Sequence, residues 1–271
     1  MNLDGLRVLI AHDWLAYWGG AERTLAEMFA VVPQADLVVA VRSPRLKDRN
    51  DITRRARETW VSRIPFARTH HRWFVPLHHA AFAGIDTRGY DLVISSSFAF
   101  AKSVRAAPGR PHFCYCYSPP RYLWDLAETY RSQSSPVGSA GLAVSTPLLR
   151  ALDRRGAHGV AAFAGISSFV AQRIRMAYGR DATVIYPPVS NKAGVSGLRG
   201  REPFLLVVGR LVAYKRVDLA IQAAERLQMQ LVIAGVGPER SRLERLANRW
   251  TTFVGEVDEA TAADLMERCA A

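Results

Sequence analysis

FLLVVGRLVAYKRVDLAIQAAERL, residues 204–227, contains a complete strand, turn and helix. Its first five residues are all apolar, as expected of a strand that is buried on both faces of a parallel sheet. Gly209 ends that run, and from Val217 onward apolar residues recur at helical spacing. The members of this stripe are Leu219, Ala220, Ala223 and Leu227. A strand, a short turn and an amphipathic helix form one βα unit, which indicates a parallel α/β fold.

The same unit recurs twice towards the C-terminus. Apolar runs predict strands over residues 230–234 and 252–254, and helical spacing predicts helices over 239–246 and 259–269. Three strands with three helices make about half of a doubly wound domain, which normally has five or six strands. Residues 191–271 therefore predict an incomplete Rossmann-like domain.

The N-terminal part of the chain shows the same alternation of apolar runs and amphipathic segments. The predicted strands cover residues 6–11, 37–41, 91–95, 112–115, 160–164 and 183–186. The predicted helices begin at Gly19-Gly20 and cover residues 121–130, 146–155 and 167–178, with a serine-rich loop over 132–145. Pro187-Pro188 cannot continue a strand and marks a hinge, and residues 191–202 form a polar linker. We predict an α/β fold of two Rossmann-like domains with parallel sheets, residues 1–190 and residues 191–271.

Most of the net charge of +12 belongs to the first predicted domain. Residues 1–190 hold 24 basic and 14 acidic residues, and residues 191–271 hold 12 and 10, so the two parts carry +10 and +2. Residues 42–72 alone contain ten basic and three acidic residues. One explanation is a solvated surface in an arginine-rich chain. The other is an anionic partner such as a membrane surface or a phosphorylated lipid. Nucleic acid fits poorly, because the segment lacks the ordered aromatic residues of an RNA platform.

The composition excludes several classes of protein. With 49% hydrophobic and 22% charged residues, the chain is neither disordered nor a disulfide scaffold. No apolar run reaches the roughly 18 residues of a membrane span, and no signal peptide precedes the first strand. Cys114 and Cys116 alternate onto one face of a predicted strand, as buried thiols do, and Cys269 makes an odd third cysteine. We expect a cytoplasmic protein.

Three loops lie where ligands of parallel sheets bind, at the carboxyl ends of strands. The first ends in Gly19-Gly20 at a helix start, where backbone N–H groups can approach a phosphate; a tight turn without a ligand is the alternative. The second, residues 209–215, carries Arg210 and Lys215, which can converge on one diphosphate or form a solvated basic loop. In the third, Gly235 and Gly237 precede a helix. None of these loops has the G-x-G-x-x-G fingerprint, so the sequence does not support NAD binding.

Several segments occur together in an order that resembles glycosyltransferase family 4. They are GGAER (19–23), VIYPPV (184–189), GRLVAYKRVDLAI (209–221), LVIAGVGPE (231–239) and FVGEV (253–257). HDWL (12–15) and CYCYSPPRYLWD (114–125) are similar to segments of bacterial mannosyltransferase-like members. The resemblance spans the whole chain. It implies the GT-B fold and a retaining glycosyltransferase that moves a sugar from a nucleotide-diphosphate sugar, GDP-mannose, to a glycan or lipid-linked acceptor.

The resemblance also implies roles for the candidate donor-site residues. Arg210 and Lys215 would hold the donor diphosphate, beside Gly235 and Gly237. Gly19 and Gly20 would approach it from the first domain. No metal is expected, because the two cations would stabilise the leaving diphosphate and no DxD-type carboxylate pair is present. The acceptor would bind the basic first domain, at the inner face of the cell membrane.

On the acceptor side the candidates are less specific. Tyr117 stands where related sequences often carry a histidine near the reacting sugar, and it is predicted to be catalytic together with Asp13. For His12 and Asp13, at the end of the first strand, structural capping and substrate contact are both open. Arg121 and Asp125, four residues apart on a predicted helix, are either an ion pair or acceptor contacts. His70-His71 and His78-His79 lack the carboxylate or cysteine partners of a metal site.

Members of the family carry two glutamates eight positions apart that contact the donor sugar and ribose. Glu259 and Glu267 have this separation, but they fall within a predicted helix upstream of where the motif belongs. We therefore expect the chain to be truncated, with an unpaired sheet edge in its second domain and little transferase activity of its own. The alternatives are an inactive or binding-only fragment of such an enzyme, and a sugar-nucleotide epimerase with the same fold.

Overall fold

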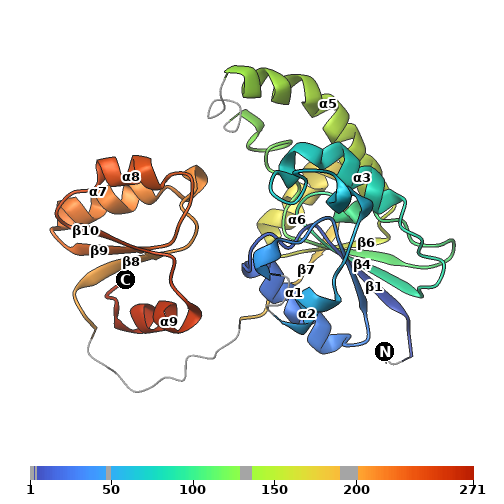
Figure 1. Cartoon of the computed structure of the whole chain (residues 1–271), viewed down its shortest axis with the longest axis horizontal. Helices are drawn as coiled ribbons and strands as arrows, with labels where there is room; N and C mark the ends of the chain where they lie inside the picture. The colour runs from blue at the N-terminus through green and yellow to red at the C-terminus, as the bar shows by residue number, and fades with distance from the viewer. Residues whose placement is uncertain (1–2, 4, 47–49, 129–135, 190–200) are drawn as a thin grey trace. The chain divides into compact units, whose positions relative to one another are not determined.

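The structure is a computed structural model that describes residues 3, 5–46, 50–128, 136–189 and 201–271. It divides into two compact units, residues 1–188 and 189–271 (Figure 1). Each unit is built on a parallel sheet with helices packed against it. The predicted α/β fold with two parallel sheets is confirmed.

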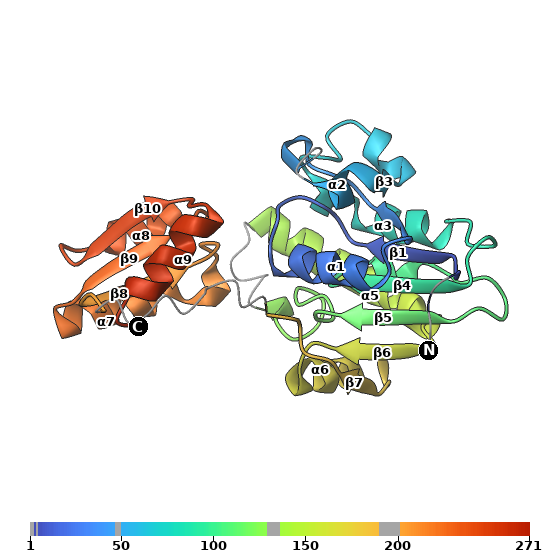
Figure 2. The ribbon, with the colours of Figure 1, turned by 90° about the horizontal axis from the view of Figure 1, so that it is seen from below.

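The sheet of the first unit has the strand order β3-β2-β1-β4-β5-β6-β7 within the described residues (Figure 2). Its strands are β1 (Val8–His12), β2 (Asp36–Val39), β3 (Arg57–Glu58), β4 (Leu92–Ser97), β5 (His112–Cys116), β6 (Ala162–Gly165) and β7 (Ala182–Val184). All of these strands pair in parallel. The order reverses between β1 and β4, which is where ligands bind in open parallel sheets.

Helices cover both faces of this sheet (Figure 1). They are α1 (Gly20–Val31), α2 (Asp51–Arg55), α3 (Val75–Ala83), α5 (Pro136–His158) and α6 (Ser168–Tyr178). Strand alternation divides β1 between two clusters: Leu9 and Ala11 pack with α3 and α5, whereas Val8 and Ile10 pack with α1. Burial on both faces explains why β1 is continuously apolar.

Two predicted elements of the first unit differ from the structure. Helix α5 begins at Pro136, so residues 136–145 are helical where a serine-rich loop was predicted; proline is tolerated in a first helical turn. Residues 121–126 are turns, where a helix was predicted. Residues 129–135 lie outside the described residues. The part of α5 near its C-terminus is anchored by a buried ion pair of Asp153 with Lys102, at 2.5 Å.

The second unit has a three-stranded parallel sheet in the order β10-β9-β8 within the described residues. Its elements are β8 (Phe204–Val208), α7 (Val217–Leu227), β9 (Gln230–Ala234), α8 (Arg240–Leu246), β10 (Thr251–Gly255) and α9 (Glu259–Arg268). The core lies between the sheet and α7 and includes Leu211, Ile221 and Ile233.

The outer edge of β8 is not bare, which corrects the expectation of an unpaired edge. The backbone N–H of Ala270 donates to the carbonyl of Phe204 at 2.9 Å, and the N–H of Leu206 donates to the carbonyl of Ala271 at 2.8 Å. Arg268 also forms an ion pair with Glu202, beside the start of β8, at 2.7 Å. The residues after α9 therefore occupy the β8 edge.

Candidate functional site

A chain of hydrogen bonds, buried at His12 and Ser96 and half-buried at Tyr117, links the carboxyl ends of β1, β4 and β5. The parallel register places His12, the last residue of β1, opposite Ser96 of β4. His12 Nδ1 lies 3.0 Å from Ser96 Oγ, and Ser96 Oγ lies 2.9 Å from the hydroxyl of Tyr117, which follows β5. Three strands that are distant in sequence thus bring a histidine, a serine and a tyrosine together.

The direction of each hydrogen bond follows from the far end of this chain. Tyr117 donates its hydroxyl hydrogen to the carbonyl oxygen of Ala21 at 2.9 Å. Because that uses the one hydrogen of the phenol, Ser96 must donate to Tyr117, and His12 must donate to Ser96 from Nδ1. Burial raises the pKa of Tyr117 above its usual value. Tyr117 is thus a neutral phenol, which can position a substrate hydroxyl but is poorly suited to removing its proton.

Glu22 completes this cluster from the first turn of α1. Its Oε1 lies 3.7 Å from His12 Nε2, and both side chains are buried. Its Oε2 accepts the backbone N–H of Gly19 at 2.8 Å, so Glu22 satisfies an otherwise free donor at the helix start. The sequence analysis missed Glu22 and Ser96. The available signal for Glu22 was its capping-box position, three residues after Gly19.

The two glycines at the start of α1 have different surroundings. A Cβ on Gly19 would lie 3.1 Å from the Tyr17 ring and 3.2 Å from Glu22 Oε2. A Cβ on Gly20 would meet nothing within 4 Å. Gly19 is therefore required by local packing, and its N–H is engaged by Glu22. Gly20 borders open space, as a position that a phosphate approaches must.

Asp13 is fully buried and organises the loop after β4. Its Oδ2 accepts the backbone N–H groups of Phe98 and Ala99 at 2.6 and 2.8 Å, and its Oδ1 accepts those of Phe100 and Ala101 at 2.7 and 2.6 Å. Four charge-assisted hydrogen bonds to one carboxylate form a structural anchor. Of the two roles that the sequence left open for Asp13, the geometry favours structural capping.

Asp125 pairs with a residue that the sequence did not suggest. Its carboxylate forms an ion pair with Arg173 of α6, which is buried and also donates to the carbonyl of Pro119 at 3.3 Å. Arg121 and Asp125 lie in a run of turns, so the helical i,i+4 spacing expected of them is absent. Arg121 is exposed at the start of this segment. The Arg173 contacts tie residues 119–125 to α6.

In the second unit, the loops after β8 and β9 pack backbone against backbone. Gly209 donates to the carbonyl of Ala234 at 2.9 Å, and Leu211 donates to that of Val236 at 3.0 Å. A Cβ on Gly235, at φ +152°, would overlap the Gly209 carbonyl, and a Cβ on Gly237 would overlap that of Leu211. These glycines are therefore needed for loop-to-loop contact. They do not form a helix N-terminus, since α8 begins only at Arg240.

Arg210 and Lys215 belong to the loop after β8. Arg210 is half-buried, and Lys215 is exposed at the end of a 3-10 turn over Ala213–Lys215. The Lys215 ammonium lies over Gly209, because a Cβ placed on that glycine would be 2.6 Å from Lys215 Nζ. Both cations are thus held at the carboxyl end of β8, on a loop that the glycine contacts fix in place.

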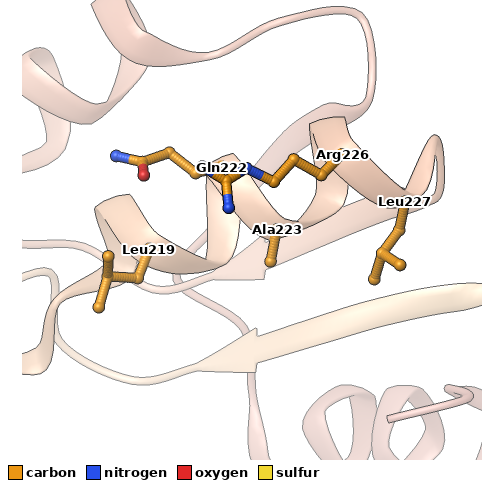
Figure 3. Close-up of a pocket in the computed structure, with 5 residues that line it drawn as sticks. All are labelled: Leu219, Gln222, Ala223, Arg226 and Leu227. Carbon is orange, nitrogen blue, oxygen red and sulfur yellow. The ribbon is translucent and has the colours of Figure 1, made fainter.

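A shallow hollow in the same unit lies away from these loops. It is lined by Leu219, Gln222, Ala223, Arg226 and Leu227, all on the outer side of α7 (Figure 3). It includes neither Arg210 nor Lys215. Among the described residues, no cluster of three or more histidine, cysteine or acidic side chains could hold a metal ion, and no helix is long and apolar enough to cross a membrane.

A known family model matches the sequence of the second unit. Residues 190–270 match the family model described as "Glycosyl transferases group 1". A search of curated protein sequences found no match.

Solved structures resemble the chain over nearly its full length. HepE of Anabaena, in complex with UDP and glucose, is 15% identical with a TM-score of 0.61, over 97% of this chain and 72% of HepE. The lipopolysaccharide outer core galactosyltransferase WaaB is 15% identical with a TM-score of 0.56, over 98% of this chain and 73% of WaaB. AviGT4, a glycosyltransferase involved in avilamycin A biosynthesis, is 15% identical with a TM-score of 0.52, over 98% of this chain and 68% of AviGT4. The chain thus has the GT-B fold, and its second unit matches the glycosyl transferases group 1 model.

Proposed function

We propose that this chain binds a nucleotide-diphosphate sugar through its second unit and transfers the sugar, with retention of configuration, to a hydroxyl acceptor. The observation that carries the proposal is the loop with Arg210 and Lys215 at the carboxyl end of β8, inside the region that matches the group 1 model. Arginine offers forked hydrogen bonds to phosphate oxygens and lysine a compact charge, so together they suit a diphosphate.

The proposed chemistry breaks one bond and forms one. The acceptor oxygen forms a bond to the anomeric carbon on the face from which the nucleotide diphosphate departs. The electron pair of the broken bond stays on the diphosphate oxygen, and the hydroxyl proton of the acceptor passes to that oxygen. Arg210 and Lys215 stabilise the negative charge that builds up on the leaving group. In this proposal the two cations take the place of a divalent metal ion.

The first unit contributes the acceptor side in this proposal. Tyr117, held by Ser96 and by the Ala21 carbonyl, offers a neutral hydroxyl that can orient a sugar or acceptor. The hydrogen bond from its hydroxyl to the Ala21 carbonyl ties it to the first turn of α1, next in sequence to Gly20. The excess of basic residues in residues 1–190 fits an acceptor that is a glycan or a lipid-linked glycan at an anionic membrane surface on the cytoplasmic side.

The donor sugar is proposed as mannose carried on GDP, on the resemblance of residues 12–15 and 114–125 to mannosyltransferase-like sequences. The test is calorimetric titration of the full chain with GDP-mannose, GDP, UDP-glucose and UDP, in the presence of a chelator. We expect GDP-mannose to bind tightest and the chelator to leave binding unchanged. If UDP-glucose binds tightest, the donor is UDP-glucose and not GDP-mannose. If the chelator abolishes binding, the proposal of a metal-free site is overturned.

Turnover separates the proposed transferase from its alternatives. Nucleotide release should require both the donor and an acceptor, such as a lipid-linked glycan. Conversion of the donor sugar without an acceptor would instead indicate an epimerase. Donor binding without any release would indicate a binding-only chain, and the absence of binding to every nucleotide tested would remove the proposal.

A further inference from the structure

A tight turn in the first unit holds an aromatic residue in a backbone conformation that normally requires glycine. The N–H of Ala67 donates to the carbonyl of Ile64 at 3.1 Å, which closes a β-turn with Pro65 and Phe66 at its centre. Phe66 has φ +64°. With proline at the first central position, this is a type II turn, whose second central position favours glycine or asparagine. A phenylalanine there is strained by about 1–2 kcal/mol.

Burial of the Phe66 side chain within the unit does not compensate for this strain. Phe66 is 75% exposed, and Trp73 nearby is 76% exposed. His70 lies between them, with ring centroids 6.5 Å from Phe66 and 4.6 Å from Trp73. The three rings form one continuous exposed group, which we call the aromatic ridge. It lies in the segment between β3 and α3.

Positive charge predominates around the aromatic ridge. Residues 59–85 contain three arginines and no acidic residue. Arg63 is exposed just before the turn. Arg68, just after it, is 48% exposed and forms an ion pair with Glu58 at 2.9 Å. Exposed aromatic rings bordered by arginines are typical of surfaces that enter the headgroup region of an anionic bilayer. Aromatic rings lie at that interface. Each cation near the membrane surface contributes about 1 kcal/mol to the binding free energy.

We propose that the aromatic ridge is a membrane-docking surface, with Phe66 and Trp73 inserted among the headgroups of an anionic bilayer and Arg63 and Arg68 against lipid phosphates. This inference rests on the membrane part of the proposed function and assigns residues to it. It explains why a strained turn presents a phenylalanine to solvent: local strain persists where function requires it. The charge pattern favours a lipid surface over a second copy of this chain, whose ridge would carry the same positive charge.

The test is co-sedimentation of the full chain with vesicles of phosphatidylcholine alone or mixed with phosphatidylglycerol, at low and high salt and without any donor. The variants are Phe66→Gly, Trp73→Ser and both together. Met176→Ser is the matched control, since Met176 is 76% exposed on α6. We expect the parent chain to bind the anionic vesicles more strongly at low salt. The double variant should bind at least tenfold more weakly, and Met176→Ser should bind like the parent.

Phe66→Gly gives an independent readout. Because glycine removes the strain at positive φ, the variant should melt at a higher temperature than the parent while binding vesicles more weakly. The proposal is overturned by a double variant that binds like the parent, by equal loss in Met176→Ser, or by a parent that binds no vesicle. Parent dimers that Phe66→Gly dissociates, without vesicle binding, would identify a protein interface instead. Donor titration without vesicles is a separate measurement, so failure of sugar transfer and failure of docking are distinguishable.

Discussion

Arg210 and Lys215 differ in their exposure to solvent. Lys215 is exposed but lies over Gly209, whereas Arg210 is half-buried on the preceding part of the same loop. If both stabilise a leaving diphosphate, Arg210→Ala and Lys215→Ala should each reduce turnover at least a hundredfold, since a charge contact to a developing anion contributes roughly 3 kcal/mol. Steady-state nucleotide release is the measurement.

The control for these variants is Arg226→Ala, which removes an exposed cation from α7 in the same unit. It should leave turnover unchanged. If the chain binds the donor without releasing nucleotide, the same comparison is made on the dissociation constant. Equal effects of all three substitutions would show that only the net charge of the unit matters.

Gly19 and Gly20 give a second prediction at the residue scale. Gly19→Ala should lower the melting temperature, because its Cβ would press on the Tyr17 ring and on the Glu22 carboxylate. Gly20→Ala should leave the melting temperature unchanged or raise it slightly, because nothing lies within 4 Å and alanine favours a helix. If a phosphate approaches Gly20, the same substitution should weaken donor binding. A Gly20→Ala variant with parental affinity would remove Gly20 from the donor site.

At the scale of elements, the second unit was the most predictable part of the chain. Each of its strands and helices was predicted to within one residue at both ends, because apolar runs alternate there with helical segments and glycine marks the turns. The apolar face of α7 was predicted wrongly, since Leu219, Ala223 and Leu227 of the expected stripe are exposed. Val217, Ile221 and Ala224 are buried instead. Helix α3 was missed because it has no apolar stripe to detect; buried residues such as His78 and His79 lie beside Val75 and Phe82. Its histidines were considered only as metal ligands, whereas both are buried against neighbouring elements.

The contacts of the candidate site were less predictable than its elements. The carboxyl ends of β1, β4 and β5 could be placed from the sequence to within two residues, but not the register that puts His12 opposite Ser96. Arg173 was missed because its partner Asp125 lies across the fold and no local pattern relates the two. The capping position of Glu22 is local, but its approach to His12 is not. Gly235 and Gly237 were predicted for phosphate contact, and that stays a prediction; the reason for them that the structure shows is the close approach of two loops.

The buried histidine of strand β5, His112, should make the stability of the first unit depend on pH. His112 is buried and its Nε2 lies 2.8 Å from Ser95 Oγ, and burial lowers its pKa from 6.5 to about 4. Between these values the unfolded chain binds a proton that the folded protein does not, so stability falls as the pH decreases from 6.5 towards 4. The loss is at most about 3 kcal/mol for this residue. His112→Gln should therefore reduce the acid sensitivity of unfolding.

Urea titrations at neutral and mildly acidic pH, followed by tryptophan emission, measure this effect. Five of the six tryptophans, residues 14, 18, 60, 73 and 124, belong to the first unit, so the signal reports mainly on it. His158→Gln, at an exposed position of α5, is the control. An unchanged pH dependence in His112→Gln would show that other groups, such as His79, whose pKa burial lowers to about 3, dominate the acid response.

For the whole molecule, the two units should differ in stability. The first has a central strand that is buried throughout and core clusters on both sides of its sheet. In the second, no residue of β10 or α9 is buried. Smaller units bury a smaller fraction of their surface and are less stable. Trypsin should therefore cleave first near Lys192 or Arg199, in a polar and glycine-containing sequence, and leave a persistent fragment that ends after Pro187-Pro188.

Donor nucleotide should reduce this difference, because a ligand that binds only the folded second unit stabilises it. At a ligand concentration one hundred times the dissociation constant the gain is about 2.7 kcal/mol, which corresponds to roughly hundredfold slower proteolysis when cleavage requires unfolding. Loss of the fragment that contains residues 201–271 should thus slow with GDP-mannose in the parent chain and not in Lys215→Ala. The fragment that contains residues 1–188 provides the internal control, since the ligand should not change the rate at which trypsin degrades it. Equal protection of parent and Lys215→Ala would place the nucleotide away from the β8 loop.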